Sequence, residues 1–164
     1  DSMETQGSKS QFKAKALEGG DLSSLAMAAG EIGLGQLPQE DRTDLLRRIA
    51  ASGNDDAMLV LSELVGQCGG GCDELHPSVS NFDQIAWRLV SCHFGRDCEP
   101  NGRLVREKCL SFNVCLKGSY RDYVRHFEAT PYQFELAVKK ERQILDLLAR
   151  GALDELFPLR SKRD

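Results

Sequence analysis

The sequence predicts an all-α protein of about seven to eight antiparallel helices, arranged as an array of αα-hairpins or as an orthogonal bundle and stapled by disulfides. Three observations support this prediction. Apolar residues recur with a helical period along most of the chain, glycine or proline marks the ends of the helical segments, and six cysteines are present. No stretch shows the period-two alternation of a half-buried strand.

We expect a single helical domain over residues 9–158, with a flexible segment at 1–8 before it and a basic tail at 159–164 after it. A chain of 164 residues is long enough to bury a substantial core. The glycine-rich loop at 66–79 is the clearest break in the pattern and the alternative point of subdivision.

The first half of the chain contains a predicted helical hairpin. Two short helices, Phe12–Leu17 and Leu22–Ile32, come first and end at glycines. Helices at 40–52 and 55–67, joined by a Gly-Asn pair, are then typical of one αα-hairpin of a helical repeat protein. No second copy follows at a fixed period, so a solenoid is not predicted.

The second half has the stronger helix start signals. Ser80 and Asp83 form a capping-box-like pair that opens one helix, and Pro100 opens the next. The sequence TPYQ at 130–133 combines a cap, a proline at the first position and a glutamine at the third, and predicts a helix that runs to about Arg150. The residues of this last helix expected to point inward are Phe134, Val138, Leu145 and Leu148.

The cysteines limit the chemistry and the compartment. They are Cys68, Cys72, Cys92, Cys98, Cys109 and Cys115. A structural zinc site uses knuckles of the C-x2–4-C type, which the first two cysteines match and the two C-x5-C pairs do not. A thioredoxin-like centre needs C-x-x-C after a strand, and the sequence predicts neither. An even set of cysteines is instead typical of structural disulfides formed in an oxidising compartment, the first pair closing the glycine-rich loop.

Chain entropy does not select the pairing of the other four cysteines. A Cys92–Cys98 closure and a Cys92–Cys109 closure differ in stabilisation by less than about 1 kcal/mol. Cys92 and Cys109 fall on the apolar stripes of adjacent predicted helices, whereas Cys98 and Cys115 each follow a helix end. We therefore predict Cys92–Cys109 with Cys98–Cys115. Local closure of each C-x5-C pair is the alternative.

Composition argues against several classes of partner. The net charge is −4 and no basic face is evident, whereas nucleic-acid binders carry a strong basic excess. No apolar run approaches the roughly 18–20 residues that span a bilayer. The N-terminal residues have neither the basic nor the apolar region of a signal peptide, so we expect that any signal peptide has been removed and that the protein is periplasmic or secreted.

Residues 97–102 resemble the start of an EF-hand calcium loop. The glutamate that such a loop needs at position twelve is replaced by Lys108, so no calcium site is predicted. Asp97 or Glu99 is expected to cap the helix that opens at Pro100 instead. Neither a cofactor nor a metal ion is predicted for the chain.

No H-E-x-x-H, G-x-S-x-G or P-loop pattern occurs in the sequence. A catalytic site could still be assembled from distant residues around His93 or His126, for example as a His93–Asp97 pair. This assembly is the enzymatic alternative. The simpler interpretation gives both histidines surface or capping roles.

An aromatic and basic helix is predicted around residues 120–127. An amphipathic core helix explains it most simply, but aromatic residues and arginine also dominate binding hot spots. The candidate partner-binding residues are Tyr120, Arg121, Tyr123, Arg125 and Trp87. Trp87 falls just off the apolar stripe of its own helix, where it either covers the disulfides or is exposed as an anchor.

The pattern A-W-x-L-x-x-C-x-x-G-x-x-C at 86–98, followed by a helix and the C-x5-C pair at 109–115, resembles one found in uncharacterised secreted helical proteins of Gram-negative bacteria. The resemblance covers about 30 residues. It implies a bacterial envelope or secreted location, and it brings no established activity and no catalytic residues.

These observations favour a non-enzymatic domain of the periplasm or secretome that binds another protein, such as a toxin-immunity protein, an inhibitor or an envelope adaptor. The alternatives are a secreted enzyme with a site around His93 or His126, and a small-molecule carrier with a pocket between helices. The first hypothesis predicts an exposed apolar or aromatic patch. The enzyme hypothesis predicts a pocket that holds a histidine or a carboxylate with a perturbed pKa. The sequence leaves the oligomeric state open.

Overall fold

A computed structural model describes residues 39–67 and 81–157, and within these ranges the chain forms helices and their connections without a strand. In chain order the elements are α3 (Gln39–Ser52), α4 (Asp55–Gln67), α5 (Asn81–His93), α6 (Arg103–Phe112), α7 (Tyr120–Tyr123), the π-helix η2 (Val124–Glu128), α8 (Pro131–Ala149) and α9 (Leu153–Leu156). The predicted all-α fold with disulfides is confirmed. The two short helices predicted before residue 39 and the Cys68–Cys72 pair lie outside the described residues.

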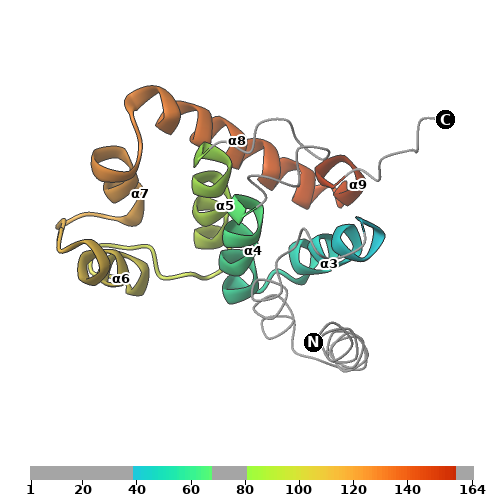
Figure 1. Cartoon of the computed structure of the whole chain (residues 1–164), viewed down its shortest axis with the longest axis horizontal. Helices are drawn as coiled ribbons and strands as arrows, with labels where there is room; N and C mark the ends of the chain where they lie inside the picture. The colour runs from blue at the N-terminus through green and yellow to red at the C-terminus, as the bar shows by residue number, and fades with distance from the viewer. Residues whose placement is uncertain (1–38, 68–80, 158–164) are drawn as a thin grey trace, which may run out of the picture.

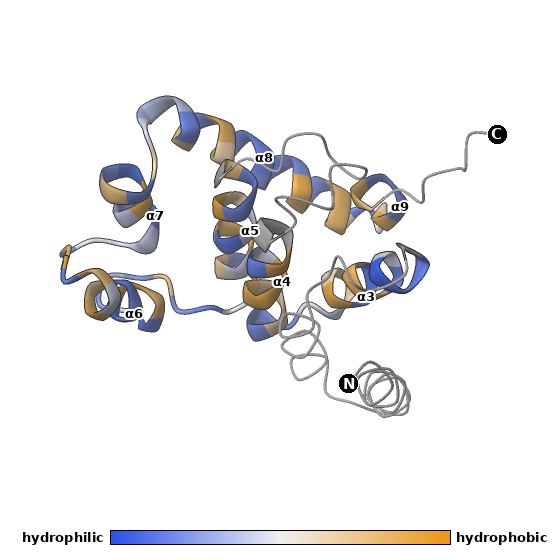
Figure 2. Ribbon diagram, viewed as in Figure 1, coloured by the Kyte–Doolittle hydropathy of each residue, from blue (hydrophilic) through white to orange (hydrophobic). Residues whose placement is uncertain are grey.

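Helix α5 lies at the centre of the molecule and packs along both α4 and the long α8 (Figure 1). Helices α3 and α9 contact each other on one side of this centre, and α6 and α7 lie together on the other. In Figure 2 the hydrophobic residues of α3 lie toward α4, while its hydrophilic N-terminal end points away. None of the described helices has the length and apolar composition needed to cross a bilayer.

Two clusters of buried apolar residues flank α5. The first contains residues of α3, α4, α8 and α9 and receives Ala86, Trp87 and Val90 from α5. The second contains residues of α6, α7, η2 and α8 and receives Ile85 and Leu89. Because α5 contributes to both clusters, it is buried on two sides and fixes the position of every element that packs against it.

Several helix ends follow the predicted signals. Gly53 ends α3 with a φ of +62°, and the Asn54 side chain caps α4 by accepting a hydrogen bond from the amide of Ala57 at 2.9 Å. At the start of α8, Thr130 and Gln133 form the predicted capping box, with proline at the first helical position. Local chemistry therefore determines these boundaries.

Helix α6 begins at Arg103, so the start predicted at Pro100 is wrong. Asp97 performs the expected capping from outside the helix: its side chain accepts from the amide of Arg103 and its carbonyl accepts from that of Leu104, both at 3.2 Å. Gly102 lets Asp97 come this close, since a Cβ at that position would lie 2.6 Å from the Asp97 carbonyl oxygen. The Asp-to-Gly spacing that resembles a calcium loop thus serves to start a helix.

The disulfides join Cys92 to Cys98 and Cys109 to Cys115, with Cα–Cα distances of 5.7 and 4.5 Å. The predicted crossed pairing is therefore wrong, and local closure of each C-x5-C pair is correct. The cause is local: after each helix a residue with positive φ turns the chain back toward the helix end. That residue is Gly95 after α5, at +108°, and Asn113 after α6, at +53°.

Tryptic mapping without reductant will test the pairing. Local closure predicts that peptide 109–117 is recovered alone, lighter by two hydrogens, and that peptides 89–96 and 97–103 are recovered as one linked pair. The crossed pairing instead predicts one species in which all three peptides are linked, and finding it would contradict the structure.

A pH-dependent contribution to stability is expected from Asp122 at the start of α7. Its carboxylate accepts hydrogen bonds from the amide and hydroxyl of Ser119, at 3.0 and 2.7 Å, and these bonds lower the pKa of Asp122. A carboxyl whose pKa is lower in the folded state stabilises the fold above its ordinary pKa of about 3.9, and this stabilisation is lost as the pH falls through the lowered value.

Asp122→Asn should therefore reduce the free energy of unfolding at pH 7 by roughly 0.5–1 kcal/mol, and the difference from wild type should shrink between pH 4 and pH 2. Urea denaturation across this range measures it. The matched control is Asp44→Asn on the exposed side of α3. If the Asp122 difference stays constant over the whole range, the proposed role of its charge is wrong.

Candidate functional site

The structure buries three of the five residues predicted to contact a partner. Tyr120, Tyr123 and Trp87 are 0%, 2% and 4% exposed. The Trp87 ring stacks on Phe157, with centroids 5.8 Å apart, and the two tyrosines belong to the second apolar cluster. Their assignment to a partner surface is corrected: they are core residues, because α7 turns its aromatic side toward α5 and α6.

The remaining aromatic and basic character of this region lies a few residues further on, where η2 meets α8. Phe127 and Tyr132 are 51% and 69% exposed, and Arg125 is also exposed. The Arg125 guanidinium lies 4.8 Å from the centre of the Phe134 ring, a cation–π contact. We call Arg125, Phe127 and Tyr132 the aromatic corner.

The π-helical turn of η2 shapes this corner. The amide of Ala129 donates to the carbonyl of Val124 at 3.0 Å, five residues back rather than four. The turn therefore holds one residue more than an α-helical turn. Turns of this kind are rare in proteins and occur frequently at functional sites.

Glu128 fixes the base of the corner to the rest of the fold. One oxygen accepts from the hydroxyl of Tyr120 at 3.0 Å, and the other pairs with Lys108 of α6 at 2.7 Å. Arg88 of α5 lies 3.7 Å from the same carboxylate. Burial, together with the negative charge of Glu128, raises the pKa of Tyr120. The hydroxyl therefore stays protonated and donates a hydrogen bond to Glu128.

The second feature is a pocket of about 510 Å³ where three helices end. The lining includes Ala51 and Gly53 at the end of α3, His93 and Phe94 at the end of α5, and Leu148 and Gly151 at the end of α8. Among the described residues that line it, His93 alone has an ionisable side chain. We call this the apolar pocket.

Beside the apolar pocket, His93 of α5 and Arg121 of α7 meet at Glu141 of α8. This carboxylate is 2% exposed, and its oxygens accept from Arg121 Nη2 at 2.6 and 2.8 Å. The Nε2 atom of His93 lies 2.9 Å from Oε1 of the same carboxylate. Glu141 is thus a buried anion whose charge is balanced by partly exposed cationic or hydrogen-bonding groups.

The other histidine is placed differently. His126 Nδ1 lies 2.7 Å from the backbone carbonyl oxygen of Asp122, and within the described ranges no ion pair joins its ring to a carboxylate. The suggested His93–Asp97 pair does not form in the structure, because His93 contacts Glu141 and Asp97 caps α6. Of the two candidate histidines, only His93 combines a carboxylate partner with a pocket.

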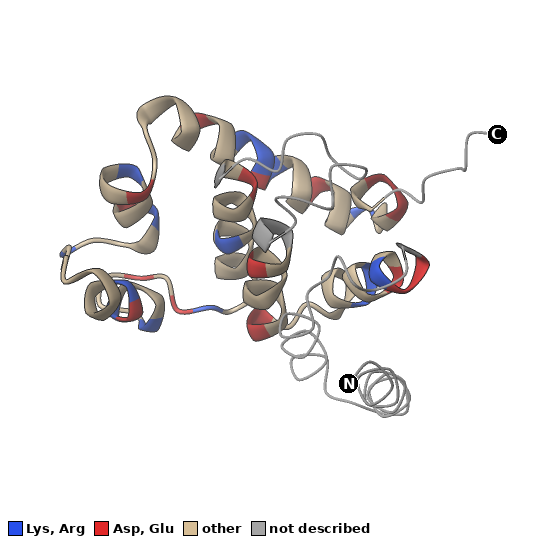
Figure 3. Ribbon diagram, in the orientation of Figure 1, with Lys and Arg blue, Asp and Glu red and all other residues tan. Residues whose placement is uncertain are grey.

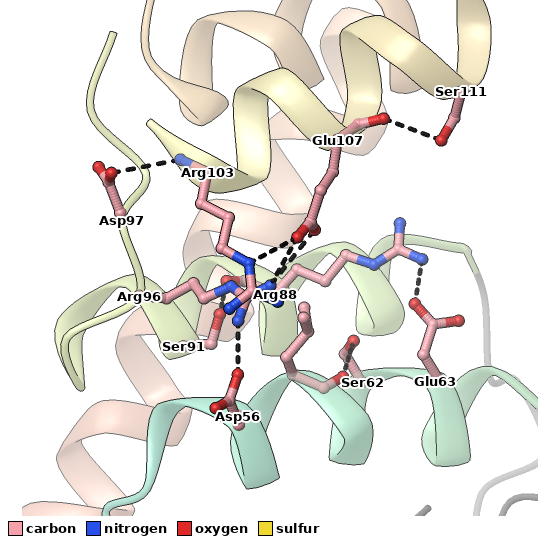
Figure 4. A network of polar contacts seen from close by, with 11 residues as sticks. Asp56, Ser62, Glu63, Arg88, Ser91, Arg96, Asp97, Arg103, Glu107 and Ser111 are labelled. Atoms are coloured by element: carbon pink, nitrogen blue, oxygen red, sulfur yellow. Dashed lines mark hydrogen bonds and ion pairs between the residues drawn. The ribbon is translucent and has the colours of Figure 1, made fainter. Parts of the chain in front are cut away.

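Sequence reasoning missed Glu141 and Arg96. Glu141 lies on the apolar stripe of α8 between Val138 and Leu145, so a charged residue at an inward position was the available signal. Arg96 is 4% exposed and joins two helices: it pairs with Asp56 of α4 at 2.6 Å and with Glu107 of α6 at 3.3 Å (Figure 4). No local pattern distinguishes it from a surface arginine.

Basic and acidic residues are interspersed along the described helices, as Figure 3 shows. Within the same part of the chain, no group of three or more histidine, cysteine, aspartate or glutamate side chains is arranged to hold a metal ion. Comparison with protein-family models, with curated proteins and with solved structures finds no match to this chain.

The role of Glu141 can be tested by Glu141→Gln, which keeps its shape and removes its charge. The loss of charge-assisted hydrogen bonds in a buried site should lower the free energy of unfolding by about 1–3 kcal/mol. The matched control is Glu135→Gln, which is exposed on the same helix and should change it by less than about 0.5 kcal/mol. Denaturant unfolding measures both. Equal effects would show that Glu141 does not organise this site.

Proposed function

We propose that this protein is a non-enzymatic domain of the periplasm or the cell exterior that binds another protein through the aromatic corner. The observation that carries the proposal is the exposure of two large aromatic rings, Phe127 and Tyr132, beside Arg125. Aromatic residues and arginine are enriched in protein interfaces and among the residues that dominate their affinity. A toxin-immunity protein, an inhibitor and an envelope adaptor all act by such binding.

The contacts beneath the corner support the proposal. The Phe127 ring packs against the buried Tyr123 ring, with centroids 5.3 Å apart, and Glu128 ties the same turn to α5 and α6. A surface that is already ordered loses less conformational entropy when a partner binds. The corner is therefore suited to recognition by a preformed surface.

The compartment is proposed from the disulfides. The Cys92–Cys98 and Cys109–Cys115 bonds fit an oxidising environment, where such bonds form and persist. The periplasm and the cell exterior are both environments of this kind.

Catalysis around His93 is the second candidate function. It is favoured by one observation: the hydrogen bond between His93 and the buried Glu141, beside the apolar pocket. A carboxylate that orients an imidazole is a common arrangement for general-base catalysis. Turnover of an ester or amide that is lost in His93→Gln and kept in His126→Gln would favour this second function over the first.

Site-specific photo-crosslinking tests the binding proposal. A benzophenone amino acid placed at residue 127 or 132 should give a discrete adduct with one protein in cells that express the full chain. The control position is Leu110, which is 83% exposed and lies about 200° around α6 from Lys108, on the side of α6 turned away from Glu128. It should give no such adduct.

The purified partner then allows a quantitative test. Phe127→Asp should weaken binding by roughly 30-fold or more, the effect of a hot-spot residue, whereas Leu110→Asp should change it less than about threefold. Adducts that form equally from all three positions, or an affinity that Phe127→Asp leaves unchanged, would remove the aromatic corner as the binding surface.

A further inference from the structure

The apolar pocket combines an aliphatic wall with an unusual electrostatic setting. Helices α3, α5 and α8 all end at it, so three helix C-termini meet around one cavity of about 510 Å³. Each C-terminus carries a partial negative charge that favours a cation within the last turn. The side chains of Leu145, Leu148 and Leu153 supply the aliphatic part of the lining.

Among the described residues, no lysine or arginine lines the pocket. Neither α3 nor α8 has a basic residue in its last turn, and α5 has only His93. Arg150, the C-cap residue of α8, is paired with Asp146, and Arg47 of α3 is paired with Asp154. In the part of the lining that the structure describes, the partial charge of the helix ends is therefore not offset by a fixed cation.

His93 adds a hydrogen-bond acceptor to the lining when its ring is neutral. In the neutral tautomer whose Nε2–H donates a hydrogen bond to Glu141, the other ring nitrogen is an acceptor. The Phe94 ring next to it has a negative face that attracts cations. Both groups favour a ligand that combines positive charge with hydrogen-bond donors.

We propose that the apolar pocket binds a primary aliphatic ammonium group, with the alkyl chain against Leu145 and Leu148 and the ammonium at the three helix ends. The ligand is either a free alkylamine or the side chain of a lysine. This site goes beyond the proposed function, because it lies at the C-terminal end of α8, whereas the aromatic corner lies at the N-terminal end. Nineteen helical residues separate these ends by roughly 28 Å.

Three probes of four carbons each test the proposal: n-butylammonium, 1-butanol and butyrate. Methyl NMR of the full-length protein should show saturable shifts of Leu145 and Leu148 with butylammonium, at an affinity about tenfold above that for butanol. Butyrate should bind most weakly. Equal affinities for butylammonium and butanol, tighter binding of butyrate, or no saturable shift with butylammonium would overturn the proposal.

A pair of variants tests the electrostatic argument. His93 is about half exposed, at 49%, so both His93→Lys and His93→Gln should fold, which thermal unfolding checks. The fixed charge in His93→Lys should lower the affinity for butylammonium by about tenfold, whereas the neutral His93→Gln should stay within about threefold of wild type. Equal affinities in the two variants would overturn the proposed role of charge.

Nα-acetyl-lysine amide identifies the source of the ammonium group. Affinity at least equal to that of butylammonium assigns the pocket to a lysine side chain, and exclusion of the lysine derivative assigns it to a free amine. Both results keep the proposed chemistry. Phe127→Asp should leave butylammonium binding unchanged, so failure at the pocket and failure at the aromatic corner can be told apart.

Discussion

Burial of α5 on two sides is the constraint on which the rest of the described structure depends. Its five apolar core residues divide between two clusters, with Trp87 and Val90 on one side and Ile85 and Leu89 on the other. A change in the rotation of α5 would therefore disturb both clusters at once. The end of the same helix also carries His93 and leads into Arg96, so the packing of α5 positions the pocket and joins α4 to α6.

Local signals were sufficient for the fold class and for many boundaries, because helix caps depend on residues close in sequence. Asn54 at the start of α4 and the Thr130–Gln133 box at the start of α8 are examples. The disulfide pairing and the start of α6 were predicted wrongly, since both depend on backbone turns after a helix end. Cys92 and Cys109 lie on the apolar stripes of their predicted helices, but these stripes do not show that the chain turns back after each helix end.

The candidate site was predictable only in part. Arg125 was among the predicted partner-binding residues and is exposed, but the burial of Tyr120 and Tyr123 depends on where α7 packs against distant helices. The polar cluster at Glu141 joins residues 48 and 20 positions away in the sequence. Spacing rules describe neighbours within one helix, so they cannot predict that side chains of α5, α7 and α8 meet.

The extra residue in the π-turn allows the aromatic corner to change by a single-residue insertion or deletion. The turn from Val124 to Ala129 encloses residues whose side chains are largely exposed, including His126 and Phe127. Loss of one residue there would restore α-helical hydrogen bonding and rotate the following aromatic ring by roughly 100°, while the core residues before the turn stay in place. A family of related chains could therefore diverge in recognition through single-residue insertions and deletions as readily as through substitutions, with the helical core preserved.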